Sequence, residues 1–263
     1  MHPILFHLGS IPVYTYGAMI ALGFIAGVSL NGWLATKVKL PAEKIIDYSL
    51  WGMAVGLVGA RLVFLLTVLP QVIADPSSAF KVWEGGFVFW GGPLAVVLFS
   101  LWYLKKFKIP FWNAADVVTH GLVIGHIIGR FGCIGAGCCY GRPTGSDWGF
   151  KFYGGLVPAH LHGIALHPTQ LYESVSLAIL LAALLWVFFH RKFEGQVVLT
   201  YFLGYPIIRS IIEIYRGDQI RGFVIDGWVS TSQFISAVVF VIAFFVLKKR
   251  LGEVGKRVPA HAP

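Results

Sequence analysis

The sequence predicts an all-α fold, a polytopic membrane helical bundle with seven transmembrane helices. Two observations lead to this class. First, 57% of the 263 residues are hydrophobic and 13% are charged, with a mean hydropathy of +0.74, whereas an ordinary soluble domain has about 25% charged residues. Second, the apolar residues gather in long stretches. This composition excludes a disordered chain, a small disulfide-stapled module and a soluble cytosolic enzyme.

Each apolar stretch is long enough to form a spanning helix, which needs about 20 residues to cross roughly 30 Å of hydrocarbon. Transmembrane strands would instead show weak alternation over about 10 residues. A helix also satisfies its own backbone polar groups inside the bilayer. The expected spans are, in chain order, Ile11–Thr36, Ile45–Leu69, Phe87–Leu104, Asn113–Phe131, Thr169–Phe189, Gln196–Ile214 and Val229–Leu247.

The basic residues beside the spans predict the orientation, because cytoplasmic loops collect Lys and Arg. The loops after the first, third and fifth spans, together with the C-terminal tail, hold Lys37, Lys39, Lys44, Lys105, Lys106, Lys108, Arg191, Lys192, Lys248, Lys249, Arg250, Lys256 and Arg257. The opposite side holds only Lys81, Arg142, Lys151, Arg216 and Arg221. We therefore expect the N-terminus outside and the C-terminus in the cytoplasm. The formal charge of +9 then reflects topology and contact with anionic lipid headgroups, and predicts no nucleic-acid partner.

We expect a single integral membrane domain over residues 1–263, because no internal repeat or linker divides the chain. Its longest connection, at about residues 132–168, faces outward in this topology, and long loops rich in Gly, His, Cys and Tyr more often have a function. Cys133, Cys138 and Cys139 lie in it. Buried free thiols are the default interpretation, while a disulfide on an oxidising face and a metal site stay open, although a C-x4-C-C run is not a standard zinc spacing.

Charged residues lie inside or at the ends of the apolar stretches at Arg61, Arg130, Arg209 and Glu213. A charge near the bilayer centre costs about 2.5 to 3.5 kcal/mol on insertion scales, so such residues indicate a functional site. Arginine offers a fixed fork of donors suited to phosphate or carboxylate. We therefore expect at least two of the arginines to line a substrate cavity.

A polar helical face is predicted by Tyr205, Arg209, Glu213 and Arg216, because their spacings of 4, 4 and 3 residues bring them to one side of a helix. The alternative is that Glu213 pairs with Arg209 or Arg216 only so that the helix can insert.

A second face combines His126 with Arg130, four residues apart. Gly129 and Gly132 have no side chains in the same region, which allows another backbone or a lipid headgroup to approach. A single histidine in such a helix is more often a hydrogen-bonded packing residue, so His126 and His120 are weaker candidates.

The segment from His167 to Glu173 predicts a helix start, because Pro168 precedes polar residues and then an apolar run. The free amides and the positive end of the helix dipole would then lie at the outer boundary, where an anion can bind. The alternative is an ordinary capped helix.

Several motifs occur together in the chain. In chain order they are Tyr14-Thr15-Tyr16-Gly17, Val82-Trp83-Glu84-Gly85-Gly86, Gly91-Gly92, Gly129-Arg130-Phe131-Gly132 with Tyr140-Gly141, His167-Pro168-Thr169-Gln170-Leu171-Tyr172-Glu173, and the face from Tyr205 to Arg216. Over nearly its whole length the chain thereby resembles the bacterial phosphatidylglycerol:prolipoprotein diacylglyceryl transferases.

The resemblance implies a multi-pass enzyme of the bacterial inner (cytoplasmic) membrane. Such an enzyme moves the diacylglyceryl group of phosphatidylglycerol to the lipobox cysteine thiol of a prolipoprotein, which forms a thioether and releases glycerol 1-phosphate. Its partners would be phosphatidylglycerol, a prolipoprotein signal peptide and membrane lipids. It implies no cofactor, no metal and no nucleic acid.

Site residues follow from the motifs and the resemblance together. The expected catalytic residues are Arg130, Arg209, Tyr16 and Tyr205. The expected substrate-binding residues are Gly129, Gly132, His167, Gln170, Glu173, Glu213, Arg216 and Arg61. We expect Arg130 and Arg209 to clamp the phosphate, because a guanidinium stays cationic in a water-poor cavity, where its attraction to phosphate is strongest.

The chain departs from the family pattern at Trp90, where many members have a histidine proposed as the base that activates the thiol. It also has Cys133, Ala136 and Cys138 where the common signature has Asn or Glu. The candidate proton acceptors are Tyr16, His126, His167 and Glu213.

Two other functions stay open: a non-catalytic relative that binds lipid or signal peptide, and a metal- or thiol-dependent membrane protein.

Overall fold

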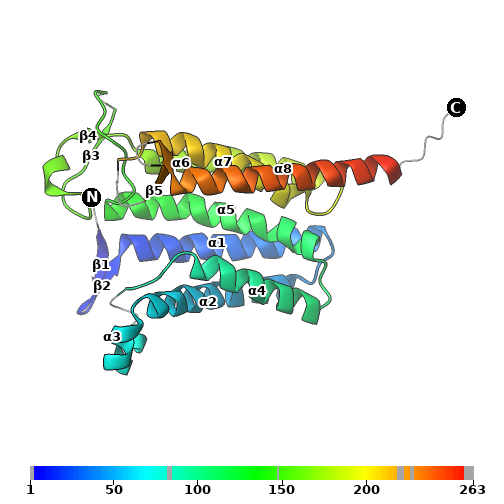
Figure 1. The fold of residues 1–263 in the computed structure, drawn as a ribbon, viewed down its shortest axis with the longest axis horizontal. Helices are drawn as coiled ribbons and strands as arrows, with labels where there is room; N and C mark the ends of the chain where they lie inside the picture. The colour runs from blue at the N-terminus through cyan, green and yellow to red at the C-terminus, as the bar shows by residue number, and fades with distance from the viewer. Residues whose placement is uncertain (1–2, 82–84, 147, 218–221, 226–227, 258–263) are drawn as a thin grey trace. The chain divides into compact units, whose positions relative to one another are not determined.

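The computed structural model describes residues 3–81, 85–146, 148–217, 222–225 and 228–257 (Figure 1). Val82, Trp83 and Glu84 of the predicted motif therefore lie outside the described residues. The long helices are α1 (Thr15–Lys37), α2 (Ala42–Thr67), α4 (Gly91–Lys106), α5 (Phe111–Ala136), α6 (Thr169–His190), α7 (Gln196–Tyr215) and α8 (Thr231–Arg257). Short helical turns are α3 (Leu69–Ala74), η1 (Pro76–Phe80) and η3 (Ala159–Leu161).

The structure is mostly helical, and five helices are long and apolar enough to cross a membrane: α1, α2, α5, α6 and α7. A chain with several such helices is a multi-pass membrane protein. The helix α4 has only 16 residues, fewer than the about 20 that a span needs. The seven spans and the orientation of the termini thus stay predictions.

Within the described residues, three short hairpins depart from the all-α prediction. They are two-stranded and antiparallel, and pair β1 (Ile4–Leu8) with β2 (Ile11–Tyr14), β3 (Phe150–Lys151) with β4 (Ala165–Leu166), and β5 (Phe223–Ile225) with β6 (Val229–Ser230).

These hairpins move two predicted helix starts. The first helix begins at Thr15 and not at Ile11, because Gly9, with φ of 60°, turns the chain so that β2 pairs with β1. The last helix begins at Thr231 and not at Val229, because Val229 pairs with β5. In contrast, the predicted start of α6 at Thr169 is confirmed.

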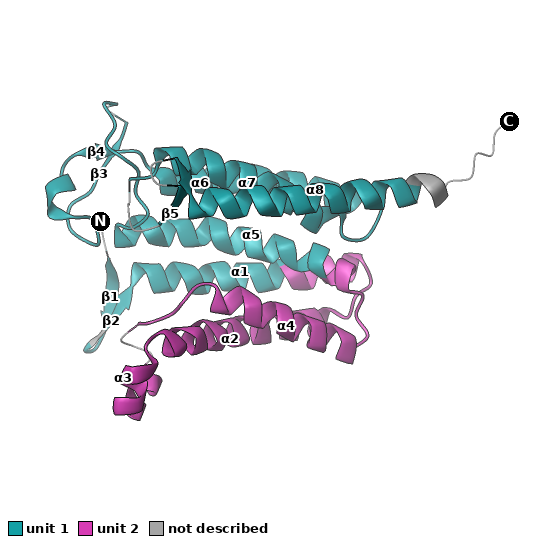
Figure 2. Cartoon of the chain, in the orientation of Figure 1, with its two compact units in different colours: residues 1–30, 115–263 teal, residues 31–114 magenta. Residues whose placement is uncertain are grey.

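The chain divides into two compact units, one of residues 1–30 and 115–263 and the other of residues 31–114 (Figure 2). In the smaller unit α2 packs against α4. A β-carbon placed on Gly59 would lie 2.6 Å from the carbonyl oxygen of Gly91, so these helices touch through their backbones. The single-domain organisation stays a prediction.

In the larger unit, glycines bring α1 and α5 together. A β-carbon on Gly23 would lie 2.9 Å from the carbonyl oxygen of Gly125, and one on Gly27 would lie 2.7 Å from that of Gly121. Small residues at a helix interface permit such close approach, which is how membrane helices gain packing contacts.

A buried carboxylate ties the start of α5 to the turn between α6 and α7. Asp116 accepts hydrogen bonds from Arg191 Nη1 at 2.7 Å, from the Gly195 amide at 2.8 Å and from the Val198 amide at 3.0 Å. The Asp116 side chain is fully buried. Two of its partners are amide groups at the first turn of α7, which have no acceptor within that helix, so Asp116 caps α7 from another part of the chain.

The glycine contact predicts opposite effects of two alanine substitutions in α1. Gly27→Ala pushes a methyl group into the Gly121 carbonyl and should lower the free energy of unfolding by about 1 to 3 kcal/mol. Gly17→Ala is the matched control, because a β-carbon there meets no atom within 4 Å; it should leave stability unchanged or raise it by about 0.5 to 1 kcal/mol. Thermal unfolding in detergent measures both. Equal midpoints for the two variants would contradict the contact.

The Asp116 cap predicts a large loss of stability in Asp116→Asn. Removing one partner of a buried ion pair costs about 3 to 5 kcal/mol, because the other charge is left uncompensated. The control is Asp47→Asn, whose carboxylate is 46% exposed and pairs with Lys44; exposed pairs contribute about 0 to 1 kcal/mol. Denaturant or thermal unfolding of the detergent-solubilised chain compares them, and similar losses in both would refute the cap.

Candidate functional site

The carboxylate of Glu173 is the centre of a buried polar cluster. Its side chain is 1% exposed. Its Oε1 atom accepts a hydrogen bond from Arg130 Nη2 at 2.7 Å and from the Tyr205 hydroxyl at 3.3 Å, and lies 3.3 Å from His126 Nε2. A carboxylate so far from water requires such partners, so the four side chains form one unit.

Three helices supply this cluster. Arg130 and His126 are one turn apart on α5, Glu173 lies in the second turn of α6, and Tyr205 comes from the middle of α7. The rings of His126 and Tyr205 meet in a T-shaped arrangement, with centroids 5.6 Å apart. Tyr201, one turn earlier on α7, stacks on Tyr205 at 5.5 Å. These ring contacts fix the direction of the Tyr205 hydroxyl toward Glu173.

A second ion pair lies further along α7, between Arg209 Nη2 and Glu213 Oε2 at 2.7 Å. Ser232 of α8 donates to the same carboxylate oxygen at 3.3 Å. This is the ion pair expected from the alternative in which Glu213 only neutralises an arginine so that the helix can insert. The prediction that Arg216 lies on this helical face is wrong. The helix α7 ends at Tyr215, and Arg216 has extended backbone with φ of −71° and ψ of 144°.

Each of the two central guanidinium groups keeps one buried nitrogen without a partner. Among the described residues, Arg130 Nε and Arg209 Nη1 are buried and make no hydrogen bond. Both arginines act electrostatically on Glu173 and on Tyr205. Because buried donors are costly when unsatisfied, these two unpaired nitrogens suit an acceptor that arrives from outside the protein.

The start of α6 is attached to the loop before it. Gln170 Nε2 donates to the Cys138 carbonyl at 2.7 Å, and Thr169 Oγ1 donates to the Cys139 carbonyl at 2.7 Å. Gln170 Oε1 is buried without a partner in the described structure. The predicted role of Gln170 in substrate binding stays a prediction, but its amide group has an established structural contact.

His167 lies just before α6 in an aromatic group. Its Nδ1 atom lies 3.1 Å from the Tyr172 hydroxyl. Its ring contacts those of Tyr215 and Trp148 at centroid distances of 5.3 and 6.3 Å. These contacts pack His167 among aromatic rings, and its predicted role in substrate binding stays a prediction.

The two glycines of the predicted signature allow α1 to approach α5. A β-carbon on Gly132 would lie 3.2 Å from Tyr16 Cα, and one on Gly129 would lie 3.3 Å from Ile20 Cδ1. Tyr16 is 45% exposed and lies within electrostatic range of Arg130. Gly132 therefore places Tyr16 near the Arg130 cluster.

Arg61 belongs to the smaller unit, where main-chain oxygens surround its guanidinium group. It donates to the carbonyls of Ser78 at 2.9 Å and Gly86 at 3.1 Å, and also to that of Gly85. A guanidinium group bound in this way stabilises the loop after α3. Trp90 of the same unit is 56% exposed at the start of α4.

His120 lies in a different environment on α5. Its Nδ1 atom is 2.9 Å from the Asp116 carbonyl, and its ring packs on Phe188 at 5.2 Å. It is fully buried, which fits the packing role that the sequence favoured.

Three thiols meet between α5 and α6. The Sγ atoms of Cys133, Cys138 and Cys139 all lie within 4.8 Å of one another, and none forms a disulfide. Hydrogen bonds from the other two thiols hold the pKa of the Cys139 thiol below its usual range. The sequence placed these cysteines in one loop, but it did not predict that all three sulfur atoms converge.

Two further residues escaped the sequence analysis. Tyr201 precedes Tyr205 by one helical turn, so the helical spacing alone could have revealed it. Ser232 contacts Glu213 across 19 residues, and no local pattern in the sequence signals such a contact.

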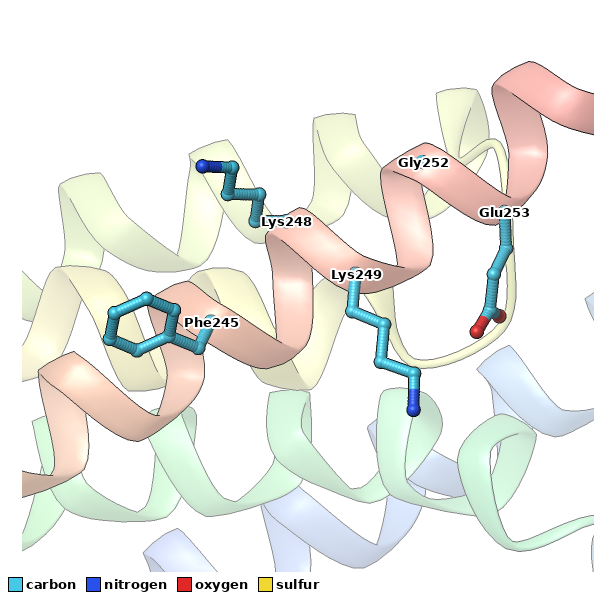
Figure 3. A pocket seen from close by; sticks show the side chains of 5 residues that line it. All are labelled: Phe245, Lys248, Lys249, Gly252 and Glu253. Carbon is cyan, nitrogen blue, oxygen red and sulfur yellow. The ribbon is translucent and has the colours of Figure 1, made fainter.

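A surface pocket lies on α8, lined by Phe245, Lys248, Lys249, Gly252 and Glu253 (Figure 3). All five residues belong to this one helix, and none is a predicted site residue. The buried Glu173 cluster, and not this pocket, is therefore the candidate site.

Comparison with known proteins gives consistent matches over the chain. A family of sequences described as "Prolipoprotein diacylglyceryl transferase" matches residues 3–248. A phosphatidylglycerol--prolipoprotein diacylglyceryl transferase of Clostridium tetani is 35% identical over 249 residues, which cover 94% of this chain and 96% of the relative. A second such protein of Clostridium perfringens is 34% identical, covering 92% of each chain, and one of Legionella pneumophila is 31% identical, covering 94% and 96%.

The buried cluster predicts that Glu173→Gln strongly destabilises the protein. The amide cannot compensate the charge of Arg130, and breaking a buried pair costs about 3 to 5 kcal/mol. Glu43→Gln in the first turn of α2 is the matched control, because Glu43 is exposed. Thermal unfolding in detergent should show a lower midpoint only for Glu173→Gln. An unchanged midpoint would show that Glu173 does not hold the cluster together.

Proposed function

Because the chain belongs to the prolipoprotein diacylglyceryl transferase family, we propose that it transfers the diacylglyceryl group of phosphatidylglycerol to the cysteine thiol of a prolipoprotein. The thiol is that of the lipobox cysteine in the signal peptide, and the second product is glycerol 1-phosphate. The family match covers nearly the whole chain, so the activity is assigned to the complete set of helices and not to one segment.

The observation that supports this function is the pair of buried arginines with unsatisfied N–H groups. A lipid phosphate has acceptor oxygens that Arg130 Nε and Arg209 Nη1 can bind. Glu173 and Glu213 each pair with another nitrogen, Nη2, of the same guanidinium groups. In this proposal the two glutamates are positioning residues that orient the arginines, whereas the arginines contact the substrate.

The reaction increases the negative charge on the phosphate. The thiolate sulfur attacks the glycerol carbon that carries the phosphate ester, a carbon–sulfur bond forms, and the carbon–oxygen bond breaks. The electron pair of the broken bond leaves with the phosphate, which changes from a diester monoanion to a monoester dianion. Two fixed guanidinium groups stabilise this charge more in the transition state than in the bound lipid, which is the requirement for catalysis.

The acceptor thiol must lose its proton before it attacks. A free thiol with a pKa near 8.5 is only a few per cent ionised at pH 7. A cationic environment favours the thiolate, so we propose that Arg130 and Arg209 also promote its ionisation. Tyr16 is exposed at the α1–α5 contact, where its hydroxyl can hydrogen-bond an incoming thiol. Because the ordinary pKa of a tyrosine hydroxyl lies above that of a thiol, the proton passes to one of the other candidate acceptors, His126, His167 or Glu213.

We further propose seven spans, with the N-terminus outside and the C-terminus in the cytoplasm of a bacterial inner membrane. The basic residues beside the spans support this orientation. The cysteine loop and the start of α6 then face outward, as does the α7 end that carries Arg209 and Glu213. In this proposal residues 1–263 act as one membrane domain.

The proposed clamp predicts that Arg130→Ala and Arg209→Ala each lower the rate of transfer by about 10² to 10³, the usual effect of removing one donor to a developing negative charge. The assay incubates purified protein with phosphatidylglycerol and a lipobox peptide, and mass spectrometry measures the diacylglyceryl adduct. Lys44→Ala is the control, since Lys44 is exposed in the smaller unit. Full activity of both arginine variants would refute the function assigned to them.

A double variant separates the clamp from a purely structural ion pair. If Arg209 only neutralises Glu213, then Arg209→Gln combined with Glu213→Gln removes both charges and should restore transfer. We expect the double variant to stay as inactive as Arg209→Ala while it unfolds at a similar temperature to the unmodified chain. Restored activity would assign Arg209 to the ion pair alone.

A further inference from the structure

The three cysteines have no role in the proposed transfer reaction, yet their sulfur atoms converge at one point. The chain has three cysteines in total, and all of them belong to this group. Cys133 is buried at the end of α5, while Cys138 and Cys139 are partly buried in the turn that follows.

The separation of the sulfur atoms matches that of thiolates around a single metal ion. A zinc–sulfur bond of about 2.3 Å places three thiolate sulfurs about 3.8 to 4.0 Å apart in tetrahedral or trigonal geometry. The observed sulfurs lie within 4.8 Å of one another. Movement of less than about 1 Å, within the reach of side-chain rotation, would therefore complete the geometry.

The backbone holds the thiols in this arrangement. Gly137 and Cys139 have left-handed φ values of 71° and 60°, and for a residue other than glycine this conformation is uncommon. The Cys138 amide donates to the Cys133 carbonyl at 3.1 Å, which closes the turn. Hydrogen bonds from Gln170 to the Cys138 carbonyl and from Thr169 to the Cys139 carbonyl attach this turn to α6. The strained turn is thus held by its surroundings.

The charges around the group fit an anionic metal centre. A divalent cation with three thiolates has a net charge of −1. Arg216 and Arg130 both act electrostatically on Cys139, and nearby positive charges offset the cost of a partly buried anion. In the described residues, the group that could bind a metal contains sulfur ligands only, which selects thiophilic cations over Mg²⁺ and Ca²⁺.

We propose that Cys133, Cys138 and Cys139 bind one Zn²⁺ ion through three thiolates, with the fourth coordination position open to water or to an external ligand. Binding displaces the three thiol protons into solvent, so no oxidant or reductant takes part. Three protein ligands with an open position are the pattern of reactive zinc sites, whereas structural sites use four. This site goes beyond the proposed transfer function and does not depend on it.

The experiment uses the full chain, purified in detergent with a reductant and without metal. A thiol titration first counts three free thiols. Zinc is then added to one sample and measured by elemental analysis after dialysis, and Co²⁺ is added to a second sample, because cobalt–thiolate bonds give an intense charge-transfer absorption. We expect one ion per chain, and we expect the variant with Cys133→Ser, Cys138→Ser and Cys139→Ser to lose both the ion and the absorption.

Each other outcome contradicts the proposal. Failure of the reduced unmodified chain to bind zinc or cobalt refutes the site, and a count of one free thiol indicates a disulfide in its place. Metal that persists in the triple variant but is lost in His162→Ala would place it on histidine. Because these readouts do not measure lipid transfer, a chain that transfers lipid but binds no metal refutes only the site, and a chain that binds zinc but transfers no lipid refutes only the function.

Discussion

The structure depends on a carboxylate buried among three helices. Glu173 is on α6, but its partners Arg130, His126 and Tyr205 come from α5 and α7. An isolated carboxylate in a bundle interior would be very costly, so the rotation of α6 about its own axis is set by the need to face these partners. The same contact orients the Arg130 guanidinium group and leaves its Nε atom available. One ion pair thus links helix packing to the chemistry.

Around this polar centre, packing is achieved mainly with small residues. The apolar surface of a membrane helix gains little by leaving lipid for protein, so close contact and hydrogen bonds must hold the helices. Gly27 with Gly121 in the larger unit, and Gly59 with Gly91 in the smaller one, bring backbones together in this way. Gly132 does the same at Tyr16, and there the close approach also delivers a side chain to the site.

The sequence alone predicted the structural features that depend on a local pattern of residues. The apolar runs predicted the long helices, and Pro168 predicted the start of α6 at Thr169. The hairpins that shift the starts of α1 and α8 were missed, because strand pairing joins segments whose partners no local periodicity reveals. Arg130 and Glu173 were both predicted site residues, but they are 43 positions apart, so their contact required the structure. The convergence of the three thiols likewise follows from the left-handed turn at Cys139.

The cap at Asp116 also has a consequence for biogenesis. Arg191, its ion-pair partner, is 75 residues further along the chain, and the capped amide of Val198 is 82 residues further. During synthesis α5 therefore leaves the ribosome well before the groups that compensate its carboxylate exist. Asp116 must stay near water until the α6–α7 turn arrives, so completion of this bundle waits for its later helices, and a chain cut off before Arg191 would leave α5 without its anchor.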